Sequence, residues 1–255
     1  MEKIKLQGLT LESVNVDTAW LIIACDKDVE SVVLPCEAEG RAVVGIGEYA
    51  FENCTHLQEL VFPDTPHGDV WEGVDYDIGA YAFSGCSRLS GVSLPHYLSS
   101  VGRGAFYGCK SLLSASWYKY TYVAPYAFAY CEALTDIPVL REVSEGEFIG
   151  CSSLASITLT AECEHIDEDA FEGCTALGEV VIPKSVKRIE ALAFRSCIGL
   201  RRVEFLNPEG WYFSSSYDEL ERPLDLSDPE KCALWLSRMD FDDGVVAWYR
   251  RDGEP

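Results

Sequence analysis

The feature that most constrains the fold of this chain is the pattern Phe-x-x-Cys-x-x-Leu, which occurs seven times. Successive phenylalanines are separated by 32, 23, 22, 20, 23 and 23 residues. Three fixed residues at near-constant spacing indicate tandem copies of one structural unit, each of which packs on its neighbours. The copies are Phe51/Cys54/Leu57, Phe83/Cys86/Leu89, Phe106/Cys109/Leu112, Phe128/Cys131/Leu134, Phe148/Cys151/Leu154, Phe171/Cys174/Leu177 and Phe194/Cys197/Leu200.

The remainder of each repeat is predicted to add a short strand. In Leu57-Gln-Glu-Leu60-Val-Phe62 the last apolar residues alternate with a solvent-facing one, which is typical of a half-buried strand. The last apolar residue of each strand forms one column of the repeat, and an apolar residue five positions before each Phe forms a second. We expect both columns to form the core. The members of the second column are Ile46, Ile78, Val101, Val123, Val143, Ile166 and Ile189.

All of the length variation falls in one connection per repeat, between the strand and the second apolar column. This gap is 16, 7, 6, 4, 7 and 7 residues, and subtracting it from the repeat length leaves 16 residues every time. Stacked coils tolerate insertions on one face only, so the variable connections are predicted to share a face.

The two ends of the chain do not repeat. Residues 29–206 hold a half-repeat and seven full repeats, whereas residues 1–28 and 207–255 lack the pattern. Because a solenoid must cover its terminal strands, we interpret these segments as an N-terminal and a C-terminal cap. Ser227-Asp228-Pro229 is typical of a helix start, and a short strand is expected at residues 245–249. The residues predicted to share one helix face are Cys232, Trp235, Leu236 and Met239.

These repeats resemble leucine-rich repeats of the BspA type, over about residues 29–206. The resemblance is carried by Ile-Gly-Glu-Tyr-Ala-Phe51-Glu-Asn-Cys54-Thr-His-Leu57 and by Ile-Asp-Glu-Asp-Ala-Phe171-Glu-Gly-Cys174-Thr-Ala-Leu177. It implies a right-handed solenoid of parallel strands with short helical turns, in a family often found on bacterial surfaces in adhesion or host-protein contact. It carries no catalytic residues. Two segments depart from the pattern: a Tyr-rich run at residues 117–122, and Glu147 in place of the usual Ala.

The charge of the chain limits the classes of partner that it is expected to bind. With 42 acids against 20 bases the formal net charge is -22, which repels nucleic-acid phosphates and anionic lipids. We therefore expect no nucleic-acid partner, and a protein or peptide with a basic surface fits better. The alternative is that the excess of acids serves only to keep the protein in solution.

The N-terminal residues bear on the cellular compartment. Their one compact apolar run, Trp20 to Cys25, is too short and too late for a secretory signal and far too short for a membrane span. We expect no membrane insertion. The chain is predicted to be cytoplasmic if Met1 is the native start, and secreted or on the cell surface if an export signal precedes it.

Seven of the eleven cysteines occupy one column of the repeat. Equivalent residues in stacked parallel strands lie about 4.8 Å apart and point the same way. Neither a disulfide nor a tetrahedral metal site fits that arrangement, so we expect buried, reduced thiols and no metal or cofactor. The cysteines outside this column, among which a pair stays open, are Cys25, Cys36, Cys163 and Cys232.

Aromatic residues of the variable connections are the candidate binding residues. Alignment of the repeats predicts that Trp117 and Tyr120 are buried. The same alignment predicts exposed side chains for Tyr97, Tyr118 and Tyr122, and the 16-residue connection carries Trp71. Clustered exposed aromatics suit peptide or sugar recognition, although they also suit packing on one another.

Three functions compete. The first is a non-enzymatic protein-binding module, which uses this aromatic face or the sheet face. The second is a carbohydrate-binding or host-contact adhesin that uses the aromatics. The third is an enzyme with an unrecognised acidic site, which we do not expect because no catalytic motif is present in the sequence. The sheet-face residues, mostly short, are Val61, Ser93, Ser116, Pro138, Thr158, Val181 and Glu204.

Overall fold

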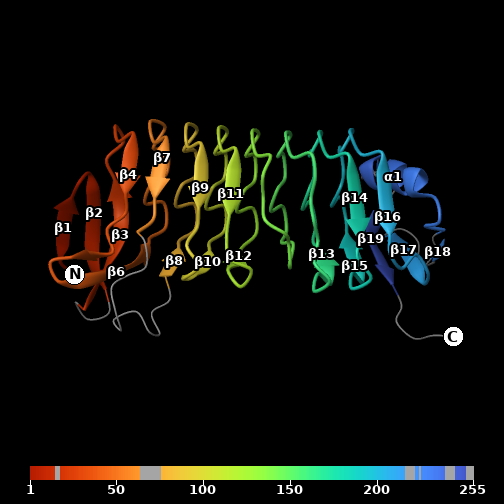
Figure 1. Ribbon diagram of the computed structural model, residues 1–255, viewed down its shortest axis with the longest axis horizontal. Coiled ribbons are helices and arrows are strands. Elements are labelled where there is room, and N and C mark those ends of the chain that lie inside the picture. The colour runs from red at the N-terminus through yellow and green to blue at the C-terminus, as the bar shows by residue number, and fades with distance from the viewer. Residues whose placement is uncertain (15–17, 64–75, 216–221, 224, 239–244, 251–255) are drawn as a thin grey trace. The chain divides into compact units, whose positions relative to one another are not determined.

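The computed structural model describes residues 1–14, 18–63, 76–215, 222–223, 225–238 and 245–250 (Figure 1). These residues belong to two compact units, 1–137 and 138–255, and each unit is described by itself. Both are built as solenoids in which successive turns of the chain add short parallel strands. The described residues include one helix, which is ten residues long, and no helix among them is long and apolar enough to cross a bilayer.

The first unit begins with an antiparallel meander. Strands β1 (Lys3–Leu6), β2 (Leu9–Val14) and β3 (Ala19–Cys25) pair in sequence order. Strand β3 then pairs in parallel with β6 (Arg41–Ile46), which also forms a hairpin with β5 (Glu37–Ala38). The parallel arrangement of this unit therefore starts on β3.

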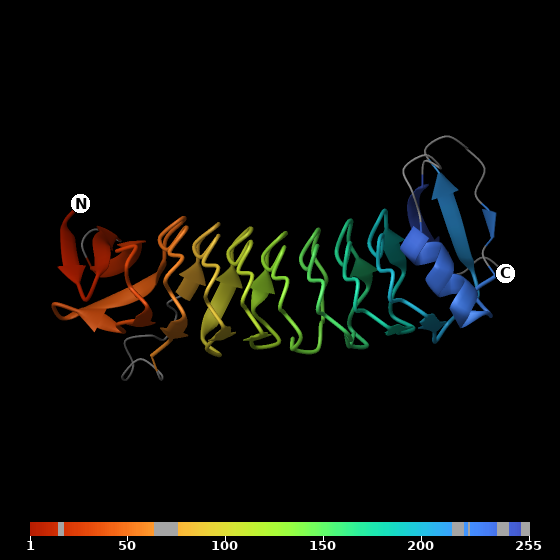
Figure 2. The ribbon, with the colours of Figure 1, turned by 90° about the horizontal axis from the view of Figure 1, so that it is seen from above.

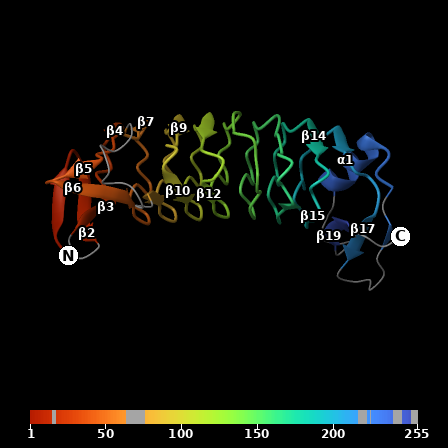
Figure 3. The same cartoon turned by 60° about the horizontal axis from the view of Figure 1, so that its bottom comes forward.

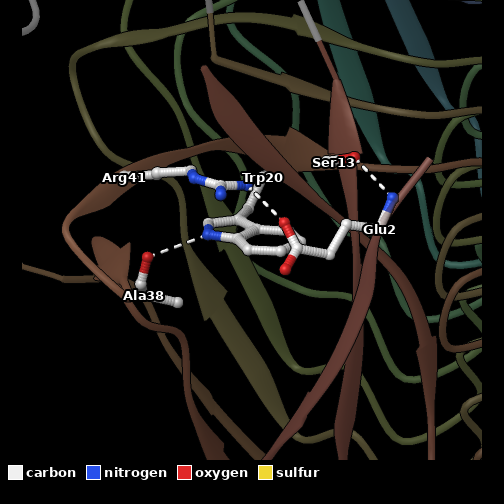
Figure 4. Close-up of polar contacts among 5 residues, drawn as sticks. All are labelled: Glu2, Ser13, Trp20, Ala38 and Arg41. Carbon is white, nitrogen blue, oxygen red and sulfur yellow. Dashed lines mark hydrogen bonds and ion pairs between the residues drawn. The ribbon is translucent and has the colours of Figure 1, made fainter. Parts of the chain in front are cut away.

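Trp20 ties these first strands together (Figure 4). Its indole is fully buried and donates a hydrogen bond of 2.8 Å to the Ala38 carbonyl. The Arg41 guanidinium lies 4.9 Å from the centre of the indole ring and donates to a Glu2 carboxylate oxygen at 2.8 Å. The Glu2 N–H in turn donates to the Ser13 hydroxyl at 2.8 Å. The contacts that run from Trp20 through Arg41 and Glu2 thus link residues of four of the five strands and the segment before β1.

The later strands of the first unit form two parallel ladders. The first ladder holds the predicted strand segments and the second holds the second apolar column. The first ladder consists of two hydrogen-bonded pairs, which are β4 (Ser31–Val33) with β7 (Glu59–Val61) and β9 (Gly91–Ser93) with β11 (Ser114–Ser116). The second continues from β6 through β8 (Tyr76–Ile78), β10 (Leu98–Val101) and β12 (Tyr122–Val123). Strands β4, β7 and β9 of the first ladder and β10 and β12 of the second are labelled in Figure 3.

The phenylalanines of the repeat stack on one another inside each unit. Ring centres of Phe51, Phe83, Phe106 and Phe128 follow at 4.7, 5.1 and 5.2 Å in the first unit. Those of Phe148, Phe171 and Phe194 follow at 5.6 and 5.3 Å in the second. All seven side chains are fully buried, as the pattern predicts. Stacked rings therefore join each described turn to the next one in its unit.

Thiols of the cysteine column donate hydrogen bonds to backbone carbonyls of the phenylalanines. The Cys86 thiol donates to the Phe51 carbonyl of the preceding turn at 3.1 Å, and Cys109 donates to Phe83 at 3.2 Å. The same contact recurs in the second unit, where Cys197 donates to Phe171. The seven thiols are fully buried, which confirms that part of the prediction. The thiols of Cys86, Cys109 and Cys197 therefore each have a defined acceptor.

In the turn around each phenylalanine, two residues have a left-handed backbone conformation. The residue two before Phe has φ between 55 and 61°, and the residue two after Phe has φ between 56 and 73°. Their N–H groups point to the next turn: Tyr49 donates to Ala80 at 3.1 Å and Asn53 to Ser84 at 2.7 Å. These segments are turns in the structure, so the short helices that we expected there are not confirmed.

The second unit continues the parallel pattern and ends in an antiparallel sheet (Figure 2). Strand β15 pairs in parallel with β13 on one side and antiparallel with β19 on the other. The parallel strands are β13 (His165–Ile166), β14 (Glu179–Ile182), β15 (Arg188–Glu190) and β16 (Arg202–Phe205). The remaining strands of the antiparallel sheet are β17 (Trp211–Ser215), β18 (Arg222–Pro223) and β19 (Val245–Arg250).

The predicted C-terminal helix is present as α1 (Pro229–Arg238). The Asp228 carboxylate caps it by accepting the N–H groups of Glu230 and Lys231 at 3.1 and 3.2 Å. Cys232 and Leu236 are buried and Trp235 is half-buried, as the helical spacing indicates, whereas Met239 lies outside the described residues. The strand expected at residues 245–249 is β19.

Strand β19 and helix α1 cover the last turn of the second unit. Strand β19 occupies the edge of β15, and the Ser237 carbonyl of α1 accepts the N–H of Ser196 at 3.0 Å. The protein without residues 207–255 should therefore aggregate or lose cooperative unfolding, because that edge strand and the apolar end become exposed. Size-exclusion chromatography and urea unfolding measure this. A monomeric product as stable as the full chain would contradict the capping role.

Glu147 takes the position that alanine occupies in the other six repeats. Its side chain is 1% exposed, and its carboxylate accepts the Ser144 N–H at 2.9 Å. Burial raises the pKa of Glu147 from an ordinary value of 4.5 to about 8. Since the folded pKa lies above the unfolded one, the protonated carboxyl contributes stability below about pH 4.5, and that stability is lost as the pH rises through about 8.

Replacing this carboxyl by an amide should remove the pH dependence. In Glu147→Gln, the free energy of unfolding relative to the wild type should rise by about 3 to 4 kcal/mol between pH 5 and pH 9. Urea unfolding of both proteins at a series of pH values measures this difference. A difference that does not change with pH would show that Glu147 is ionised in the folded protein.

Candidate functional site

A hollow of about 630 Å³ lies in the first unit where strands β7 and β9 end. The two strands lie side by side, and the chain leaves both of them at the same edge. Two members of the predicted sheet face, Val61 and Ser93, line this hollow and are exposed. The full lining is Leu60, Val61, Phe62, Pro63, Ser93, Pro95, His96 and Tyr97.

Tyr97 forms an aromatic wall of the hollow. Its hydroxyl donates to the Pro63 carbonyl at 2.9 Å, and its ring meets Tyr76 and His96 edge-to-face at 5.8 and 5.7 Å. The side chain is half-buried, so the exposure predicted for Tyr97 is only partly correct. The reason is the hydrogen bond across the hollow, which holds the ring against the start of the long connection.

Tyr118 and Tyr122 are exposed, as predicted, with 46% and 54% of their surfaces accessible. Tyr120 is 60% exposed, so its predicted burial is wrong. Thr121 is buried instead, and its hydroxyl donates to the Leu98 carbonyl at 3.0 Å. The physical reason is length: this connection is one residue shorter than the preceding one, so the chain reaches β12 by a different path. Trp117 is half-buried and stacks on Phe128 at 5.0 Å.

Strand register relates these tyrosines to the hollow. Ser93 and Ser116 are partners in β9 and β11, and the Ser116 hydroxyl donates to that of Ser93 at 3.4 Å. Pro95 in the hollow and Tyr118 each lie two residues beyond these serines, so Tyr118 follows the hollow in the next turn. Tyr122 is the register partner of Ser100 in the second ladder. We call the hollow lining together with Tyr118, Tyr120 and Tyr122 the connection face.

The other predicted residues lie elsewhere. Trp71 lies outside the described residues. In the second unit, Thr158 and Val181 are exposed, and Pro138 and Glu204 are half-buried. Among the residues that the structure describes, no group of three or more His, Cys, Asp or Glu side chains is placed to hold a metal ion.

Neither the hollow nor the exposure of Tyr120 was predicted from the sequence. A signal for the hollow was present, because the connection after Phe62 is 16 residues long and the one after Leu94 is 7. Two adjacent connections of such different length cannot follow the same path. No comparable signal marked Tyr120, whose aligned partners include the buried residues Leu98, Cys163 and Val186.

The comparison with known families agrees with this architecture. A model of the BspA type leucine rich repeat region, in 6 copies, matches residues 26–68 and 74–177. The chain belongs to the BspA-type leucine-rich repeat family. No curated protein matches it.

Two solved structures of bacterial leucine-rich repeat proteins are similar to this chain. It is similar to a leucine rich cell surface protein from Faecalibacterium prausnitzii, with 25% identity, a TM-score of 0.69, and coverage of 90% of this chain and 62% of that one. A leucine rich repeat protein of T. pallidum shares the fold at 21% identity, with a TM-score of 0.52, over 69% of this chain and 91% of that one. This chain thus spans less than two thirds of the F. prausnitzii protein.

The contact between Tyr97 and Pro63 generates a stability prediction. Tyr97→Phe should lower the free energy of unfolding by about 1 kcal/mol, because the hydrogen bond between the two connections is lost. Tyr122→Phe is the matched control, and its exposed ring should change stability by less than about 0.5 kcal/mol. Urea unfolding of both variants measures the two effects. Equal effects would mean that the Tyr97 hydroxyl makes no stabilising contact.

Proposed function

We propose that this chain is a non-enzymatic binding module that holds an extended, cationic segment of a protein partner on the connection face. The observation that carries the proposal is the hollow at the end of β7 and β9, where the sheet face meets Tyr97. Its volume of about 630 Å³ falls in the range of sites that bind ligand side chains or small molecules. Membership of a leucine-rich repeat family agrees with a scaffold role.

The sheet beside the hollow favours an extended chain. Ser93 and Ser116 are exposed and short, so a peptide backbone can approach these strands closely. An apolar side chain of such a peptide would enter the hollow between Val61 and Pro95. Recognition of an extended peptide by side-chain pockets beside a sheet is a common binding mode.

The tyrosines and the charge favour a basic partner. Exposed Tyr118 and Tyr122 offer ring faces on which an Arg or Lys side chain gains cation–π energy. Tyrosine is also enriched among residues that dominate binding energy. The formal net charge of -22 would steer a cationic segment toward the protein.

We also propose that the chain acts at a bacterial cell surface. The support is the similar F. prausnitzii protein, which is described as a cell surface protein. Protease treatment of intact cells of the source organism tests this, because a surface protein is digested without lysis. Complete protection in intact cells, with digestion after lysis, would place the chain inside.

A peptide-display selection with the purified protein tests the proposed function. We expect selected peptides to be rich in Arg or Lys, and to bind at least about 30-fold more weakly to Tyr118→Ala/Tyr122→Ala, which corresponds to about 2 kcal/mol. Ser93→Arg should have a similar effect by filling the hollow and adding a positive charge. The matched control is Ile198→Ala, which alters an 81% exposed residue of the second unit and should leave binding unchanged.

The alternatives give distinguishable results. Binding to a glycan array that is lost in Tyr118→Ala/Tyr122→Ala would replace the peptide partner by a carbohydrate. Peptides that bind equally to the wild type, the double variant and Ser93→Arg would move the site to another surface. Urea unfolding of each variant must show unchanged stability, so that lost binding is not lost folding.

A further inference from the structure

Tyrosines gather on the phenylalanine turns of the first unit, in segments separate from the connection face. The turns of that unit lie at residues 47–54, 79–86, 102–109 and 124–131. Three of the five tyrosines are 38 to 50% exposed and the other two are half-buried. The turns of the second unit, at residues 144–151, 167–174 and 190–197, contain no tyrosine. We call the five residues the tyrosine strip: Tyr49, Tyr81, Tyr107, Tyr126 and Tyr130.

Four residues of the strip have a left-handed backbone, with φ between 55 and 60°. Other repeats place glycine at the same two turn positions, as in Gly104 and Gly108. Glycine adopts this conformation freely, whereas a tyrosine there is strained. Glycine would therefore suit the turn itself better, which points to a role for the tyrosine side chains. The four residues are Tyr49, Tyr81, Tyr126 and Tyr130.

The rings of the strip are held in place by their neighbours. The rings of Tyr49 and Tyr81 stack at 5.5 Å with their planes 6° apart, and those of Tyr107 and Tyr130 meet edge-to-face at 5.2 Å. The Tyr81 ring also lies against Gly104, where a Cβ atom would be 2.5 Å from a ring carbon. Since the rings are already ordered by these contacts, a ligand would bind them with little further loss of side-chain entropy.

The strip is nearly neutral, unlike the rest of the protein. The four turns contain one arginine and two glutamates, and the Arg103 guanidinium lies 4.5 Å from the centre of the Tyr126 ring. The three turns of the second unit contain seven acids and one arginine, and the whole chain has a formal net charge of -22. The strip therefore lacks the local charge that would attract a cationic partner, and a neutral ligand fits it better.

The accessible side chains of these turns favour a sugar over a protein surface. Apart from the tyrosines, the apolar side chains that are exposed or half-buried there are Ala80 and Pro125, which are small. The core of a protein interface is usually more apolar than this. Tyrosine instead offers a ring with a hydroxyl at its tip. A sugar ring packs its C–H groups on such a ring, and its hydroxyls exchange hydrogen bonds with the phenol.

We infer that the tyrosine strip binds a neutral polysaccharide, which lies across the four turns. Adjacent turns are about 4.8 Å apart, so the strip extends over about 14 Å and contacts several sugar units of one chain. This is a binding site additional to the connection face, and it does not rest on the peptide partner proposed for that face.

Native gel electrophoresis of the full-length protein in gels that contain one soluble polysaccharide tests the inference. The neutral probes are hydroxyethyl cellulose, xyloglucan, galactomannan and dextran, and the anionic probe is polygalacturonate. We expect at least one neutral probe to retard the protein. Polygalacturonate should not retard it, because both carry a negative charge.

Glycine variants remove the rings without adding backbone strain. Tyr49→Gly/Tyr130→Gly should weaken binding to the retarding probe at least about 10-fold, because two of the exposed rings are lost. Asp169→Gly is the matched control, since it makes the same change at a left-handed position of the second unit and should leave binding unchanged. Tyr118→Ala/Tyr122→Ala should also leave it unchanged, which separates this site from the connection face.

A measurement on the wild type locates the site even if the double glycine variant fails to fold. The bound polysaccharide should slow the nitration of Tyr49 and Tyr130 by tetranitromethane and leave that of Tyr118 and Tyr122 unchanged. Peptide mapping of the nitrated protein measures this.

Three results would overturn the inference. One is that none of the four neutral probes retards the protein. Another is that Tyr49→Gly/Tyr130→Gly and the wild type are retarded equally and nitration of Tyr49 is not slowed. The third is that selected peptides, rather than polysaccharides, lose affinity for the double glycine variant, which would assign the strip to a protein partner.

Discussion

The turn around each phenylalanine is the unit on which the rest of this structure depends. Ring stacking, backbone donation from alternate residues such as Phe51 and Asn53, and a thiol that donates back to a phenylalanine carbonyl all join neighbouring turns there. Two left-handed residues per turn aim N–H groups at the neighbouring turn, although tyrosine and leucine rarely adopt such a backbone. That conformation persists because the neighbouring turn accepts its hydrogen bonds.

A fixed turn leaves only one place for the repeats to differ. The connections after the strands carry all the variation in length, and the hollow between Val61 and Tyr97 lies where two connections of unequal length begin. The fold thus separates a stabilising edge, which repeats, from a surface that is specific to this chain.

The sequence was sufficient to predict the features that recur in every repeat, but not the places where the repeat is interrupted. The buried Phe and Cys columns, helix α1 with its Asp228 cap, and strand β19 follow from periodicity and capping chemistry. Tyr120 was misassigned because alignment assumes an unchanged path, whereas a connection one residue shorter puts Thr121 inside. The left-handed position two before each Phe was not predicted either, because its residue types vary. Contacts between the N-terminal segment and a repeat, such as that of the Lys27 ammonium with the Cys54 sulfur at 3.8 Å, have no period to reveal them.

The central claim, that the turn is rigid and the connection permissive, is tested most directly by one pair of insertions in the second unit. Gly-Ser-Gly is placed in the connection between Ala161 and Glu162, or in the turn between Thr175 and Ala176, and urea unfolding is measured. The connection insertion should lower the free energy of unfolding by less than about 1 kcal/mol. The turn insertion should lower it by more than about 3 kcal/mol or abolish cooperative unfolding. Equal losses from the two insertions would contradict the account.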